Sequence, residues 1–314
     1  RTIGAHHPGR GTTMNDANGG KNRKEPSASL DALWDHADPA ASEHRFRRLL
    51  VDGGSNLSGD EQAEILTQVA RALGLQQRFD EGHAILDEIE SSATPVDPLI
   101  RVRLLLERGR LFNSAGSRDR AVPLFAAALD LAQEHGMEFL GVDAAHMLAI
   151  VEPGERSIEW NRRALDLAAG ATDPRARRWR GALWNNLGWS LHELGRHEEA
   201  RQAFEQHLAI RLSEDNEPQA AIARWSMAKM LRHLDRPAEA LSILESIRDH
   251  PDRQNNASEG YTREEIGNCL IALGRDGEAS SHLARAWALL HDDPWLQRDE
   301  PERLARLRRL GGLG

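Results

Sequence analysis

The segment from His192 to His197 comes nearer to known catalytic chemistry than any other part of this sequence. Zinc proteases place two histidines four positions apart on one helix, so that both imidazoles share a face, and a glutamate follows the first. Here the histidines are five positions apart, and Gly195 between them indicates a turn. The chain also has no glycine-rich phosphate loop and no serine-nucleophile motif. We therefore expect a protein that is not an enzyme and that needs no metal and no cofactor.

Composition narrows the possible partners and compartments. The formal net charge is −9, which argues against nonspecific binding to nucleic acid. The basic run from Arg175 to Arg180 follows Asp173-Pro174 and is expected to open a helix. No apolar stretch approaches the roughly 18 residues that a membrane span needs, and we see no secretory signal. The single cysteine, Cys269, excludes an intramolecular disulfide. We expect a cytoplasmic protein, and its alanine, arginine, leucine and glycine content suggests a bacterial one.

The pattern of apolar residues predicts helices throughout. Residues 1–27 contain almost no large apolar side chains and are predicted to be a disordered tail. Asp38-Pro39 and the capping box from Ser58 to Glu61 indicate helix starts. No segment alternates between apolar and polar residues with a period of two, so no sheet is expected and the fold class is all-α.

A repeated spacing of small residues organises the rest of the chain. A small residue is followed twelve positions later by another, and four positions beyond that by a bulky apolar residue. Small side chains let two helices cross closely, so each pair predicts a helical hairpin. The six pairs are Ala70/Gly82, Gly109/Ala121, Ala145/Ser157, Gly188/Ala200, Ala228/Ala240 and Gly267/Ala279. The third hairpin departs from the rule, because Asn161 stands where the bulky residue is expected.

Turn residues support the same division. Gly116, Gly195, Asp235 and Gly274 each follow the first small residue of a pair by seven positions, where the chain must reverse. A closing helix is expected over 301–311, with Leu304, Leu307 and Leu310 on one face. The predicted hairpins span 63–96, 102–135, 138–171, 181–214, 221–254 and 260–293.

The fourth hairpin resembles a known repeat family. Trp184, Leu187 and Gly188, followed by Ala200 and Phe204, match most of the tetratricopeptide repeat signature. Successive small positions are 39, 36, 43, 40 and 39 residues apart, whereas the standard repeat has about 34, so the array is divergent. The resemblance implies one right-handed superhelical solenoid over residues 28–314. Proteins of this family usually bind other proteins and usually do no chemistry.

In such an array the first helix of each hairpin lines the concave side, with its fifth, ninth and twelfth positions facing the groove. Cations, amides and aromatic residues dominate these positions, and Glu264 is the only acid among them. This composition suits an acidic or carboxylate-bearing peptide. The arginines could instead pair with neighbouring acids, and Trp189 and Trp225 could serve packing between helices. The predicted partner-binding residues are Arg71, Arg110, Asn113, His146, Asn185, Trp189, Trp225, Lys229, Arg232 and Asn268.

The sequence therefore predicts a scaffold or adaptor that captures a protein or peptide segment in a basic groove. It predicts no nucleic-acid partner and no membrane partner. Two other functions remain open. The array could be a regulatory sensor that closes around a small signalling peptide or ligand, or it could assemble with itself through its ends.

Overall fold

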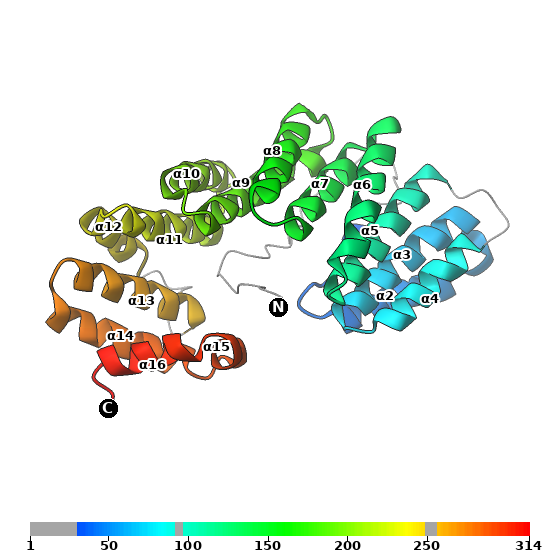
Figure 1. Cartoon of the computed structure of the whole chain (residues 1–314). Helices are drawn as coiled ribbons and strands as arrows, with labels where there is room; N and C mark the ends of the chain where they lie inside the picture. Colours follow the sequence, from blue (N-terminus) through cyan, green and yellow to red (C-terminus); the bar gives the residue numbers. More distant parts are fainter. Residues whose placement is uncertain (1–29, 92–96, 249–255) are drawn as a thin grey trace. The chain divides into compact units, whose positions relative to one another are not determined.

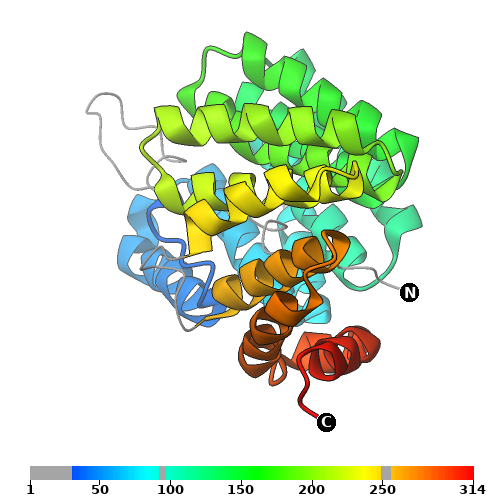
Figure 2. The same ribbon diagram turned by 90° about the vertical axis from the view of Figure 1, so that its left-hand side faces the viewer.

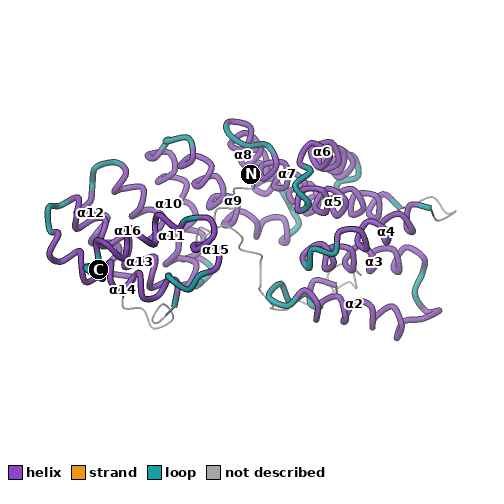
Figure 3. The backbone as a smooth tube through the Cα atoms, turned by 60° about the horizontal axis from the view of Figure 1, so that its bottom comes forward, coloured by secondary structure: helices purple, strands orange, loops and turns teal. Residues whose placement is uncertain are grey.

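The computed structural model describes residues 30–91, 97–248 and 256–314, and every regular element in these ranges is a helix (Figures 1 and 3). The predicted all-α class is therefore confirmed. The expected tail over 1–27 lies outside the described residues. In the described part, no helix is long and apolar enough to cross a membrane.

The contacts divide the chain into two compact units, and the boundary falls inside α9 (Pro174–Glu193). We call the described residues up to Trp179 the N-terminal unit and those from Arg180 the C-terminal unit. The N-terminal unit contains α2 (Pro39–Gly53), η1 (Gly54–Asn56), α3 (Gly59–Leu75), α4 (Phe79–Glu90), α5 (Pro98–Ser114), α6 (Arg118–Glu134), α7 (Glu138–Val151) and α8 (Glu155–Gly170). The C-terminal unit contains α10 (His197–Ser213), α11 (Glu217–His233), α12 (Pro237–Arg248), α13 (Ala257–Ala272), α14 (Asp276–Leu290), α15 (Pro294–Asp299) and α16 (Pro301–Leu310).

Helices α3 to α14 form the six hairpins that the spacing of small residues predicts, with an odd-numbered helix first in each. A Cβ added at Gly109 would lie 2.5 Å from the ring of Phe125. A Cβ added at Gly188 would lie 2.6 Å from the ring of Phe204. Both rings are fully buried. Glycine is needed at these two crossings because any side chain would push the bulky partner out of the interface.

The third hairpin has a polar residue where the others have a bulky apolar one. Asn161 takes the place of the bulky residue, is 1% exposed, and donates from Nδ2 to the carbonyl oxygen of Ser157 at 2.9 Å. Its turn is also different, because Gly154 adopts a φ of 72° nine positions after Ala145 instead of seven. A buried amide bonded to its own helix thus replaces an apolar contact at this crossing.

The other five hairpins reverse at the position that the sequence predicts. The seventh residue after the small position has a positive φ in each: 62° at Gln77, 82° at Gly116, 72° at Gly195, 57° at Asp235 and 71° at Gly274. Left-handed backbone ends a helix by satisfying its last carbonyl groups. Gln77 was not predicted as a turn residue, because glutamine has no special preference for this conformation.

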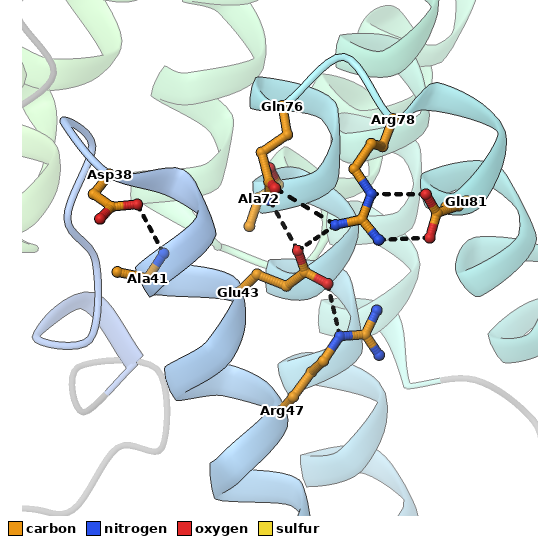
Figure 4. Close-up of polar contacts among 8 residues, drawn as sticks. All are labelled: Asp38, Ala41, Glu43, Arg47, Ala72, Gln76, Arg78 and Glu81. Carbon is orange, nitrogen blue, oxygen red and sulfur yellow. Dashed lines mark hydrogen bonds and ion pairs between the residues drawn. The ribbon is translucent and has the colours of Figure 1, made fainter.

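Additional helices stand at each end of the array. Helix α2 is joined to the first hairpin by Glu43, whose carboxylate accepts from Gln76 at 2.9 Å and from Arg78 at 2.7 Å (Figure 4). At the other end, α16 packs along α14 (Figure 2). Leu307 is fully buried and Leu304 is 9% exposed, so the apolar face of α16 is used to cover the last hairpin.

Candidate functional site

The predicted partner-binding residues fall into the two units, and their surroundings differ. Four belong to the N-terminal unit: Arg71 on α3, Arg110 and Asn113 on α5, and His146 on α7. Six belong to the C-terminal unit: Asn185 and Trp189 on α9, Trp225, Lys229 and Arg232 on α11, and Asn268 on α13. All ten therefore lie on first helices of hairpins.

In the N-terminal unit, Arg110 is neutralised by two carboxylates. It pairs with Glu107 of its own helix, and its Nη2 lies 2.6 Å from Oδ1 of Asp143 on α7. Both acids are buried. Burial alone would raise the pKa of Asp143, but the charges of Arg110 and Arg71 outweigh it and hold the pKa below its usual value. Arg110 therefore links two hairpins.

Arg71 lies near this ion pair and is covered by an aromatic ring. Its guanidinium carbon is 5.4 Å from the ring centroid of Trp34, and the indole N–H of Trp34 donates to Gln68 at 3.0 Å. No carboxylate of the described residues lies within ion-pair distance of Arg71. The neighbouring Arg103 pairs with Glu64 at 2.9 Å.

His146 and Asn113 are half-buried. The His146 ring lies 5.0 Å from that of Trp179, and burial lowers the pKa of His146 to about 4. The imidazole is therefore neutral at pH 7 and adds no positive charge to the predicted site.

In the C-terminal unit, the aromatic and amide residues are interior. Asn185 is 0% exposed, Trp189 1% and Trp225 2%. The two indole rings lie 6.1 Å apart, and the N–H of Trp225 donates to the carbonyl oxygen of Tyr261 at 3.2 Å. The prediction that these three side chains face a ligand is wrong for this conformation. The two tryptophans serve packing between first helices.

Arg232 is paired, as Arg110 is. It bonds to Glu265 of α13, which is 4% exposed. Arg303 of α16 pairs with Glu264 at 2.6 Å. Asn268 is occupied as well, because its side-chain oxygen accepts from Arg306 at 2.8 Å.

Lys229 differs from Arg232 because it has no ion-pair partner in the described ranges. Its ammonium lies 5.5 Å from the Trp189 centroid and 5.4 Å from that of Trp225. In the described ranges, no carboxylate lies within ion-pair distance of it. Burial lowers the pKa of Lys229, and the more distant charge of Glu265 opposes that shift.

Two of the predicted cations, Arg110 and Arg232, are paired with acids that stand at another repeat position. Glu107, Asp143 and Glu265 each stand two residues before the small residue of their hairpin, whereas we considered only the fifth, ninth and twelfth positions. These acids reach cations that were predicted to face a ligand. The recurrence of acids two positions before the small residue was the signal that could have revealed the pairing.

The two histidines of the rejected zinc motif do meet in space. Gly195 forms the expected turn, and this turn brings Nδ1 of His192 within 3.2 Å of Nδ1 of His197. The ring of His233 lies 4.6 Å from that of His197. Burial and the charge of Lys229 lower the pKa of His192 to about 3. Within the described ranges, no group of three or more potential ligands is arranged to hold a metal ion.

Cys269 is fully buried in α13. Burial, together with the charge of Glu265, raises the pKa of its thiol to about 12. The thiol therefore stays protonated at neutral pH and has the environment of a structural side chain, because a reactive cysteine needs an accessible thiolate.

Comparison with known proteins agrees with this architecture. A family model described as "Tetratricopeptide repeat" matches residues 179–249. No curated protein sequence matches the chain. The class defined by the fold is that of helical-hairpin repeat proteins. Residues 179–249 match the tetratricopeptide repeat, as the fourth hairpin indicated.

Several solved structures share the fold over most of the chain. The apo form of RapI has a TM-score of 0.73 at 12% identity, covering 92% of this chain and 79% of RapI. The apo form of the quorum sensor NprR from B. thuringiensis has a TM-score of 0.62 at 16% identity, covering 91% and 79%. NprR in complex with its cognate peptide NprX has a TM-score of 0.50 at 17% identity, covering 93% and 85%. At these identities the likeness shows the fold alone.

Proposed function

We propose that this protein is a non-catalytic binding protein that captures an acidic or carboxylate-bearing peptide segment on the first helices of its hairpins. The observation that carries the proposal is Lys229, a half-buried cation that has no ion-pair partner in the described part of the chain. Hairpin packing needs small and apolar residues, so a cation held in this way has no evident packing role. An anionic ligand would give it a partner.

The structural comparisons favour a peptide over other acidic ligands. NprR, which shares this fold, has been solved with its cognate peptide. Tetratricopeptide arrays offer extended surfaces suited to segments of polypeptide. We therefore propose a peptide or an exposed segment of a protein as the partner.

Reversing the charges of Lys229 and Arg232 together would be a poor test of this proposal. Because Arg232 is paired with the buried Glu265, that variant would place two carboxylates against each other and destabilise the unit. Lys229→Gln alone removes the free charge and leaves the ion pair intact.

The experiment is affinity selection of a degenerate decapeptide library on the immobilised full chain at low salt. Retained peptides are identified by mass spectrometry and compared with those retained by an empty surface. We expect the retained pool to be enriched in aspartate and glutamate, or in free carboxyl termini. A surface that retains no peptides above the empty control would contradict the proposed function.

A regulatory sensor is the second candidate, because NprR is described as a quorum sensor. A sensor changes its conformation when its peptide binds, so the radius of gyration measured by small-angle X-ray scattering should fall when a selected peptide is added. An unchanged radius would favour a passive adaptor. The third candidate, assembly through the ends of the array, gains no support at the C-terminal end, since Leu304 and Leu307 already pack inside the unit.

A further inference from the structure

A cavity of about 320 Å³ opens at one edge of the N-terminal unit. The last turns of α6 and α8 line it, together with the turn that follows α6 and the start of α7. None of the ten predicted partner-binding residues is part of its lining. Its volume lies at the lower end of the range for small-ligand sites.

The cavity lies where the third hairpin lacks a side chain that the other hairpins have. Gly141 stands four positions before the small residue Ala145. A Cβ added at Gly141 would meet the Cβ of Ala132 at 3.8 Å, an ordinary contact distance. The third hairpin thus leaves room for a side chain from another molecule. The residues at this position in the other five hairpins are all large: Leu66, Leu105, Trp184, Arg224 and Arg263.

The floor of the cavity is apolar. Ala132 is 1% exposed and Ala171 8%, and both line the cavity. Met137 and Leu167 also line it and are half-buried. Covering these groups with methylene groups removes apolar area from water and is favourable. The floor therefore suits an aliphatic stem.

Two carboxylates also line the cavity, and no cation of the described residues does. Oε2 of Glu138 accepts from the backbone N–H groups of Asp173 at 2.7 Å and of Thr172 at 2.8 Å. These bonds hold the pKa of Glu138 below its usual value, so this carboxylate is ionised at neutral pH. Asp166 is exposed. In the parts of the chain that the structure describes, neither acid has a cation within ion-pair distance.

Helix ends add to the negative character of the cavity. Helix α6 ends at Glu134 and α8 at Gly170, and the last turn of each lines the cavity. The carboxyl end of a helix carries a partial negative charge. The amino end of α7 carries the opposite partial charge, but Glu138 lies in its first turn and offsets it. The cavity as a whole therefore favours a cation.

We propose that this cavity receives an arginine side chain of a partner protein. The aliphatic stem covers the apolar floor, and the guanidinium donates to Glu138 and Asp166. Arginine fits better than lysine, because the two carboxylates belong to different helices. A guanidinium presents five donors in a planar fork, whereas an ammonium is compact and strongly hydrated. This inference adds a second subsite, with selectivity for the opposite charge, and does not depend on the proposed function.

The test measures the binding of four capped amino acids to the full chain by saturation-transfer NMR. Arginine, lysine, norleucine and glutamate are used with acetylated amino groups and amidated carboxyl groups, so that only the side chain differs. We expect capped arginine to bind with a dissociation constant on the order of 1 mM. It should bind at least about fivefold more tightly than capped norleucine, which has a stem without a charge. Capped glutamate should give no signal.

Three variants locate the binding. Gly141→Leu fills the vacancy and should abolish binding of capped arginine. Its midpoint of thermal unfolding should stay the same or rise, because a glycine inside a helix is replaced. Asp166→Asn should weaken binding about two- to threefold. Asp119→Asn is the matched control, since it changes another exposed aspartate, at the opposite end of α6 from the cavity, and should leave binding unchanged.

Each other outcome overturns a stated part of the proposal. If capped lysine binds as tightly as capped arginine, the choice of a guanidinium is wrong; if capped norleucine does, the role of the acids is wrong. If Gly141→Leu still binds as wild type does, or if Asp119→Asn loses binding, the cavity is not the site. A lowered unfolding midpoint in Gly141→Leu would make Asp166→Asn the deciding variant. The peptide selection described above uses no feature of this cavity, so the proposed function stands or fails separately.

Discussion

The first and fifth hairpins carry a cation at the same repeat position and treat it in different ways. Arg71 follows the small residue Ala70, and Lys229 follows Ala228. Each lies over tryptophan. Arg71 lies over one indole ring and Lys229 over two, and in the described ranges neither has a carboxylate within ion-pair distance. Repeat position therefore decides where a cation is placed, and the neighbouring elements decide which aromatic rings cover it.

The largest expected effect comes from removing the cation of the buried ion pairs in the N-terminal unit. Arg110→Gln should lower the free energy of unfolding by about 3 kcal/mol, because it leaves Asp143 and Glu107 buried without their cation. Lys229→Gln should change it by less than about 1 kcal/mol, because no ion pair is lost. Urea unfolding followed by circular dichroism measures both. Equal losses in the two variants would show that Lys229 is also a structural cation.

The comparison also depends on the two units sharing one packing rule. Gly109→Ala and Gly188→Ala should each destabilise the protein by roughly 1–3 kcal/mol, since the new methyl groups would meet the rings of Phe125 and Phe204. Thermal unfolding of each variant measures the loss. Gly277→Ala is the control, because a Cβ there meets no atom within 4 Å. A loss in only one of the two variants would show that the hairpins are not equivalent.

Acidification should destabilise the C-terminal unit through His192. Its pKa in the folded protein, about 3, lies below the value of about 6.5 for an unfolded chain. The neutral imidazole therefore contributes stability that is complete above pH 6.5 and is lost as the pH falls toward 3. Between pH 7.5 and 5, His192→Gln should lose about 1 kcal/mol less than wild type, allowing for partial exposure.

Urea unfolding at pH 7.5, 6 and 5 measures this difference. The control is His44→Gln, which changes an exposed histidine in the N-terminal unit. If His192→Gln and wild type lose the same stability on acidification, the neutral state assigned to His192 is wrong.

The smallest expected change in stability comes from substitutions in the turns of the hairpins. Gln77 and Asp235 adopt left-handed backbone in the first and fifth hairpins, which costs a residue with a side chain about 1 kcal/mol and costs glycine almost nothing. Gln77→Gly should therefore raise stability by about 0.5 kcal/mol, and Asp235→Gly by less, because aspartate tolerates this conformation better. Thermal unfolding measures both changes. A loss of stability in Gln77→Gly would show that its side chain stabilises the turn.

The hairpins could be predicted because their signals are local. The spacing of small residues and the glycine turns report steric requirements that hold wherever the hairpin lies, so Gly188 and Ala200 were placed correctly. The third hairpin departs from this rule, because Asn161 stands at the bulky position and donates a hydrogen bond to its own helix. Its turn also falls two residues later than in the other hairpins.

The candidate site was predicted less well. Arg110 and Asp143 are 33 residues apart, and so are Arg232 and Glu265. No rule within a single hairpin indicates that such residues will meet, because the contact depends on how two hairpins stack, and only the recurrence of the acids from hairpin to hairpin points to it. The burial of Trp189 has the same origin, as its ring packs against Trp225 of the next first helix.

The amino-acid sequence alone determined an all-helical protein of six hairpins, because close crossings and chain reversals constrain individual residues. Only the tertiary structure decided which cations are paired with acids, since ion pairing depends on distances between residues of different hairpins. That is why Lys229, one of ten candidates in the sequence, became the residue on which the proposed function now depends.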